Sequence, residues 1–258
     1  MHYITVSLRS QMQYRASFLM LALGHFVVTG VEVLGIWVLF ERFGAVRGWR
    51  LPEVALLYGL VNTAFALAEA FGRGFDVFPR MVKSGAFDRM LLRPRATALQ
   101  VMASEVQAMR VGRLTQGLIV LLWAAHRLDV DWTAARVMFT LVTIGGGMFL
   151  FCGLFVLQAT AAFWTVDSLE VFNTVTYGGT ETAQYPLHIY RPWFRRFFTY
   201  VVPLAAVAYY PATVIMGRVD DPGTLTWRLL SPLIGYCFFA ACLLIWRSGV
   251  RHYRSTGS

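Results

Sequence analysis

The sequence has few of the residues on which most enzymes and metal proteins depend. It has a single lysine, Lys83, and no GxxxxGK[ST] phosphate-binding loop, which argues against ATP hydrolysis by this chain. The three cysteines lie inside apolar runs without CxxC spacing, and the five histidines are scattered. Neither a disulfide framework nor a metal site is indicated. We therefore expect a chain that is not an enzyme and holds no cofactor of its own.

Charge is also scarce: charged residues make up 14% of the chain, whereas 57% of the residues are hydrophobic. This composition is too apolar for a soluble domain to bury in one core, and it predicts an integral membrane protein. A net charge of +9 also occurs in nucleic-acid-binding proteins. Here, however, the arginines flank apolar runs, as is typical of residues next to a membrane. We expect contacts with membrane lipids and no nucleic-acid partner.

Six apolar segments approach the roughly 20 residues that a membrane-spanning helix needs. They are Ser17–Phe40, Val54–Phe71, Leu114–His126, Val137–Val166, Phe197–Gly217 and Leu229–Trp246. The third is short and would have to borrow from the amphipathic segment Ala98–Arg113 in order to cross. The predicted fold is therefore an all-α polytopic membrane protein with six transmembrane helices in a single domain, residues 1–258.

An even number of spans places both termini on one side of the membrane. Arginines are concentrated in both terminal tails and in the segment Arg73–Arg113, so the positive-inside rule places the termini in the cytoplasm. Residues 1–16 carry an apolar stripe of Ile4, Leu8 and Met12, which predicts a helix lying in the membrane interface. A disordered tail is the alternative for these residues.

The basic segment Arg73–Arg113 has a helical pattern of its own. Apolar residues fall at helical spacing on both sides of a Ser84-Gly85 break, and Pro94 ends the second run. The two runs are Phe78, Met81, Val82 and Phe87, Met90, Leu91. This pattern predicts two short amphipathic helices at the cytoplasmic membrane surface. A basic loop that only sets the topology is the alternative.

Three stretches follow one another along the chain: SGAFDRMLLRPRATALQV, FWTVDSLEVFNTVTYGGTETAQYPLHIYRPWFRRF and VVPLAAVAYYPA. Together with the spans around them, they resemble the membrane subunit of type-2 ABC exporters, in a poorly characterised bacterial branch. The resemblance covers essentially the whole chain. It implies a multi-pass permease subunit in the bacterial cytoplasmic (inner) membrane, with a cytoplasmic coupling region at residues 73–100.

The resemblance also implies partners. ATP and Mg would be bound by separate ABC-type ATPase subunits, two per complex, and a second permease, identical or related, would complete the translocation path. The residues implied in coupling to the ATPase are Phe78, Met81, Phe87, Asp88, Arg89, Leu91, Arg93 and Pro94. They would receive the push of ATP-driven closure and tilt the spans behind them.

The fifth span has two interpretations. Type-2 permeases usually follow the fifth helix with an extracellular re-entrant hairpin, which implies a span at residues 168–187 and a hairpin at 188–217. Hydropathy and the positive-inside rule instead favour a span at 197–217 with residues 167–196 in the cytoplasm. Prolines at membrane depth are best tolerated where protein covers the backbone, so we expect the hairpin.

Polar residues within the spans are candidates for the translocation path, because charges at such depth usually face a bundle interior or a cavity. The candidates are Glu69, Asp167, Glu170 and Asn173. The alternative is that they pair with arginines and only position helices. A further expectation concerns Gly145–Gly147, which would let a neighbouring backbone approach closely.

The cargo of the transporter is not identified by the sequence. Exporters of the type it resembles often carry amphiphilic or lipid-linked molecules. A secondary transporter and a non-transporting membrane scaffold are the rival interpretations. The first would need internal repeats with matched broken helices, and no repeat relates the two halves of this chain.

Overall fold

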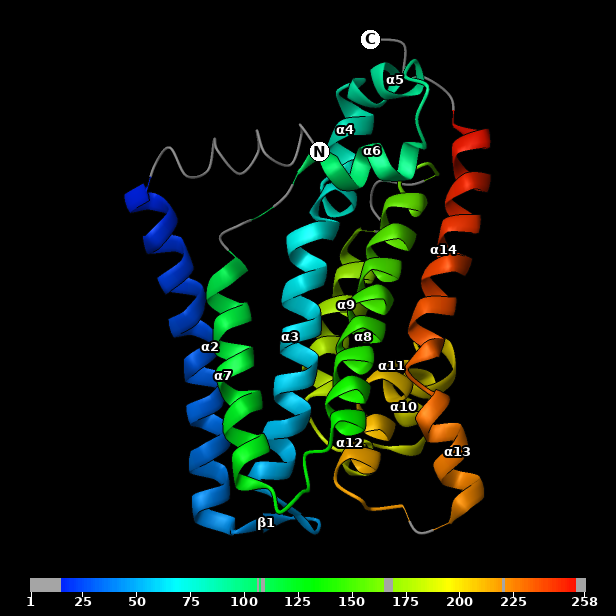
Figure 1. Ribbon diagram of the computed structural model, residues 1–258. Coiled ribbons are helices and arrows are strands. Elements are labelled where there is room, and N and C mark those ends of the chain that lie inside the picture. The colour runs from blue at the N-terminus through cyan, green and yellow to red at the C-terminus, as the bar shows by residue number, and fades with distance from the viewer. Residues whose placement is uncertain (1–14, 106, 108–109, 165–168, 220, 254–258) are drawn as a thin grey trace.

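The fold is a bundle of long helices that run side by side (Figure 1). The computed structural model describes residues 15–105, 107, 110–164, 169–219 and 221–253. Four helices are long and apolar enough to cross a membrane: α2 (Arg15–Phe43), α3 (Leu51–Asp76), α8 (Ala134–Ala161) and α14 (Leu233–His252). The predicted helical, polytopic membrane fold is confirmed at this level. Residues 1–14, which hold most of the expected interfacial helix, lie outside the described residues.

Two shorter helices run alongside the long ones in Figure 1: α7 (Val111–Arg127), with 17 residues, and α9 (Leu169–Ala183), with 15. A fifth candidate span is a pair of segments, Pro192–Val201 and Leu204–Ile215, which bend by 71° at a short break. The pair comprises α10 (Pro192–Arg196), the π-helical turn η3 (Phe197–Val201), α11 (Leu204–Val207) and α12 (Tyr209–Ile215). The described residues thus contain four or five candidate spans, and the count of six stays a prediction.

Helix α3 is the centre of the bundle. Most of its residues are buried, and α7 and α8 flank it along its length. Small residues allow the close approach: a Cβ on Gly59 would overlap the backbone of Leu121 in α7, at 2.7 Å. Since interiors are packed to crystal density, such a contact permits only glycine without displacement.

The Gly145–Gly147 stripe packs α8 against helices of the same chain. A Cβ on Gly146 would overlap the carbonyl oxygen of Pro232, just before α14, and one on Gly147 would lie 2.8 Å from Ala64 of α3. The expected close approach is therefore confirmed, and its partners are α14 and α3. A subunit boundary is not needed to explain these glycines.

The two ends of the bundle differ in structure. At one end, near the C-terminal end of α14, lie three short helices: α4 (Phe78–Lys83), α5 (Ala86–Leu91) and α6 (Thr97–Ser104). The opposite end holds a hairpin of β1 (Ala45–Val46) and β2 (Trp49–Arg50) and the amphipathic α13 (Pro222–Leu230). We call these the α4–α6 end and the β1–β2 end.

The third apolar segment borrows less from Ala98–Arg113 than expected. Helix α7 starts at Val111 and so takes up only Val111–Arg113, whereas Thr97–Ser104 forms the separate helix α6. Figure 1 shows α6 lying across the end of the bundle instead of along it. Val101 of α6 is fully buried, and its carbonyl sits where a Cβ on Gly74 of α3 would be. The helix is amphipathic because it packs on the end of α3.

Candidate functional site

The α4–α6 end begins where α3 turns directly into α4. The Val77 N–H donates to the carbonyl of Arg73 at 3.1 Å, and Pro79 lies in the first turn of α4, where its missing N–H removes no helical hydrogen bond. Between α4 and α5, Gly85 has a φ of 65°, a left-handed conformation that glycine adopts without steric cost. The two predicted short helices and the break at Ser84-Gly85 are confirmed.

Phe78 and Phe87, one from each short helix, face inward. Their ring centroids are 4.9 Å apart, and both side chains are fully buried. Phe163, just beyond α8, and Trp246 of α14 lie 5.2 and 4.9 Å from Phe78. We call these four rings the aromatic cluster. Both rings are 0% exposed, so neither presents a surface of its own at this end. The part of Phe78 and Phe87 in coupling to an ATPase stays a prediction. They anchor α4 and α5 to the helices behind.

The exposed part of this end is the last residue of α5 and the turn that follows it, residues 91–95, which we call the tip. The side chain of Leu91 is 40% exposed and that of Leu92 85% exposed. Arg93 and Pro94 follow and are exposed, as is Arg89 on α5. Leu92 was not among the predicted coupling residues, although the leucine pair directly before Arg93-Pro94 could have indicated it.

The remaining coupling candidates are partly buried. Met81 packs against the core from α4, and Asp88 lies on α5 near Tyr253. Burial, followed by the neighbouring Asp88 carboxylate, raises the pKa of Tyr253 to about 12. The phenol therefore stays neutral at physiological pH. The Tyr253 ring also contacts Phe87 at 5.1 Å, so the residue after α14 is fixed to α5.

A polar junction holds α3 to α8 where α3 turns into α4. Arg73 and Asp76 form an ion pair within α3, and the free Asp76 oxygen accepts a hydrogen bond from Gln158 of α8 at 2.9 Å. The Nε of Arg73 lies 4.0 Å from Glu105, just after α6. These contacts connect the end of α3, directly before α4, to α8 and to the residue after α6.

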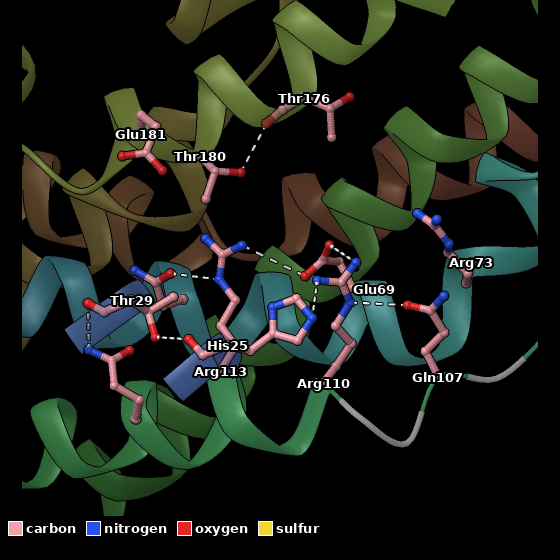
Figure 2. Close-up of polar contacts among 12 residues, drawn as sticks. His25, Thr29, Glu69, Arg73, Gln107, Arg110, Arg113, Thr176, Thr180 and Glu181 are labelled. Atoms are coloured by element: carbon pink, nitrogen blue, oxygen red, sulfur yellow. Dashed lines mark hydrogen bonds and ion pairs between the residues drawn. The ribbon is translucent and has the colours of Figure 1, made fainter. Parts of the chain in front are cut away.

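One turn deeper lies the Glu69 cluster, shown in Figure 2. Glu69 of α3 is 2% exposed, and its two oxygens lie 3.1 Å from Arg110 and 3.7 Å from Arg113 at the start of α7. The Nε of Arg113 donates to Asn62 at 3.0 Å, and its guanidinium lies 4.7 Å from the ring centre of Phe65. Each charge at this depth has a partner, as burial requires.

Hydrogen bonds continue the cluster toward α2. The Tyr58 hydroxyl lies 3.2 Å from both the carbonyl of Thr29 and the carboxylate of Glu32. Gln116 of α7 donates to the same Thr29 carbonyl at 3.4 Å. Polar contacts thus connect α2, α3 and α7 at a depth where lipid offers no hydrogen bonds.

A family model describing the ABC-2 family transporter protein matches residues 26–257, which is nearly the whole chain. The chain belongs to the ABC-2 family. No curated protein and no solved structure matches it in the corresponding comparisons. Members of this family are membrane permeases of ABC transporters and are normally not enzymes themselves. Membership also implies association with ABC ATPase subunits.

Of the other path candidates of this permease, two lie on α9. Asp167 lies outside the described residues, and Glu170 is in the first turn of α9. Asn173, one turn further, is half-buried, and its Oδ1 has no hydrogen-bond partner in the part of the chain that the structure describes. Glu69 itself is paired with arginines, as the alternative interpretation held. The role of all four in a translocation path stays a prediction.

Proposed function

We propose that this permease is the membrane subunit of an ABC exporter. Two permeases, identical or related, form the path, and two ATPases that bind ATP and Mg drive it from the α4–α6 end. The observation that carries the proposal is the exposed tip on α5, whose other face is fixed in the aromatic cluster. A force on the tip reaches α8 and α14 through rigid ring contacts.

The proposed orientation has the α4–α6 end and both termini in the cytoplasm of a bacterium, with the inner membrane around the bundle. The arginines of the tip and its neighbourhood support this, since cytoplasmic loops carry the excess of basic residues. We assign the fifth span to α9 and the re-entrant hairpin to residues 188–217. The bend of 71° between the two hairpin segments supports this assignment.

The proposed cargo is amphiphilic or lipid-linked. An apolar cavity of about 500 Å³ supports this, because it lies between α2, α3 and α7 and is rimmed by one charge, Arg127. Trp37 and Trp123 line it. Its size lies within the usual range for small-molecule sites, about 300–1,000 Å³. The apolar outer face of α2 supports lateral contact with lipid or with the second permease.

Co-purification of the ATPase tests the proposal. Leu91→Glu with Leu92→Glu places two charges on the tip, and we expect the tagged permease to lose its ATPase subunits. Leu229→Glu is the matched control, because Leu229 is 44% exposed on α13 at the β1–β2 end. The control should retain the ATPase. All variants must elute from a sizing column like the native chain.

The outcome also separates the rival functions. A secondary transporter or a scaffold would purify without an ATPase in the first place. Retention of the ATPase by the Leu91 and Leu92 double variant, with unchanged ATP hydrolysis, would contradict the tip as the docking surface. Loss in both the double variant and the Leu229 control would mean that the assay reports charge on any exposed surface, and the assignment would fall.

A further inference from the structure

A second cavity, of about 290 Å³, lies in the segment between α9 and α13. Unlike the cavity beside α2, it is lined chiefly by polar and basic side chains. They come from η2 (Leu187–Ile189), the α10–η3 turn and the start of α12. The main lining residues are His188, Arg195, Arg196, Tyr200, Tyr209 and Tyr210.

The two arginines of this cavity are free to bind a ligand. Neither Arg195 nor Arg196 pairs with a carboxylate in the part of the chain that the structure describes, and no acidic residue lines the cavity. Glu69, Asp76 and Glu53, by contrast, each have an arginine partner. The buried Nε2 of His188 likewise has no hydrogen-bond partner among the described residues. The cavity therefore offers hydrogen-bond donors and positive charge, and no carboxylate among the described residues neutralises that charge.

The walls of the cavity are held in place. Arg47, in the β1–β2 turn, donates to the carbonyl of His188 at 2.7 Å, and Trp49 contacts the ring of Tyr209 at 5.8 Å. Thr199 donates to the carbonyl of Arg195 at 2.7 Å. The arginines stand where α10 passes into a π-helical turn, a distortion that often marks a functional site. The backbone that carries the cavity is therefore fixed by contacts with the β1–β2 hairpin and within its own turn.

The end of the bundle that holds this cavity has further arginines, but Arg47, Arg50 and Arg218 are each bonded to a carbonyl or a carboxylate oxygen. The contacts with the β1–β2 turn place the cavity toward the end opposite α4, α5 and α6, where the positive-inside rule predicts few arginines. Deviations from such sequence rules are expected at functional sites. Binding of an anion would give two arginines without a carboxylate partner a role at this position.

We infer that this cavity binds a phosphate group. Arginine is well suited to phosphate, because its planar donors bind two oxygens at once, and tyrosine hydroxyls can donate to the remaining ones. A volume of about 290 Å³ admits a phosphate with a small polar substituent. Trp193 and Val201, on the neighbouring turns, are 66% and 61% exposed. They favour a phosphate borne by an amphiphile whose tails remain in the bilayer.

Binding measurements on the full chain test this inference and need neither an ATPase nor transport. The chain in nanodiscs of phosphatidylcholine is titrated with two probes, inorganic pyrophosphate and dihexanoyl phosphatidylglycerol, by calorimetry. Arg195→Gln with Arg196→Gln should weaken binding by roughly 100-fold, about tenfold for each charged hydrogen-bonding group lost. Arg191→Gln is the matched control, since Arg191 is exposed on the same segment and does not line the cavity.

The probes distinguish the source of the phosphate. Binding of the lipid probe alone supports a membrane-borne group, whereas equal binding of pyrophosphate supports a soluble phosphate. Tyr209→Phe removes one hydroxyl and keeps the ring. It should weaken binding of the preferred probe by a smaller factor, roughly threefold to tenfold. No binding of either probe, or equal weakening in the Arg191 control and the double variant, overturns the inference. A failure of the ATPase proposal leaves this result unaffected.

Discussion

At the scale of single residues, the Glu69 cluster matters most for stability. A carboxylate that is 2% exposed inside an apolar bundle would be very costly alone, and two arginines of α7 neutralise it. The arrangement joins the middle helix of the bundle to the start of α7. These ion pairs stabilise the fold little more than an apolar contact would, but the loss of one partner leaves a buried charge unpaired.

Glu69→Gln should therefore lower the free energy of unfolding by about 3–5 kcal/mol, because Arg110 and Arg113 keep their charges without a carboxylate between them. Thermal unfolding of the purified permease in detergent measures the change. Glu41→Gln is the control, since Glu41 is exposed on α2, and it should unfold like the native chain. Adding Arg110→Gln to Glu69→Gln should recover part of the loss. An unchanged unfolding temperature for Glu69→Gln would contradict the structural role.

At the scale of elements, the sequence predicts best where hydrophobicity decides. The runs that became α2, α3, α8 and α14 could be found from length alone, and the break at Ser84-Gly85 from turn chemistry. The separation of α6 from α7 could not be predicted from the sequence. It depends on the packing of Val101 against Gly74, which lies far away in the sequence. The burial of Phe78 and Phe87 could not be predicted for the same reason, because it depends on contacts with Phe163, which is also far away in the sequence. An amphipathic pattern shows that one face is covered, but not by what.

The hairpin assignment is an element-scale prediction. A Trp193→Cys variant in a background without native cysteines should react with a membrane-impermeant thiol reagent added outside spheroplasts, because Trp193 is 66% exposed on α10. A Ser84→Cys variant, exposed between α4 and α5, should react only after permeabilisation. Labelling is read by mass shift on a gel. The reverse pattern would place residues 167–196 in the cytoplasm and make 197–217 the span.

At the scale of the whole molecule, the proposed function would divide docking and transmission between two parts of the α4–α6 end. The tip is exposed and offers contacts, whereas the aromatic cluster is buried and connects α4, α5, α8 and α14. The polar junction at Arg73 and Asp76 adds α6 to the same unit. A change in the cluster should thus affect transport without removing the partner.

Phe87→Leu tests this separation. The substitution keeps an apolar side chain but loses the ring contacts to Phe78 and Tyr253, at 4.9 and 5.1 Å. We expect the ATPase to remain bound in pull-downs, while stimulation of ATP hydrolysis by the permease falls severalfold. Phe149→Leu, which loses aromatic contacts elsewhere on α8, is the control and should retain stimulation. Full stimulation in the Phe87 variant would contradict transmission through the cluster.

The β1–β2 turn has a consequence of a different kind. Arg47 is the one residue other than glycine with a positive φ in the described part of the chain, at 47°, and its side chain bonds the carbonyl of His188, 141 residues away. A strained residue persists only where surrounding structure compensates for it. The connection between α2 and α3 is thus bonded to the wall of the cavity that Arg195 and Arg196 line. If a phosphate group binds in that cavity, its binding and the position of the α2–α3 connection would be linked through this hydrogen bond, and such linkage is reciprocal.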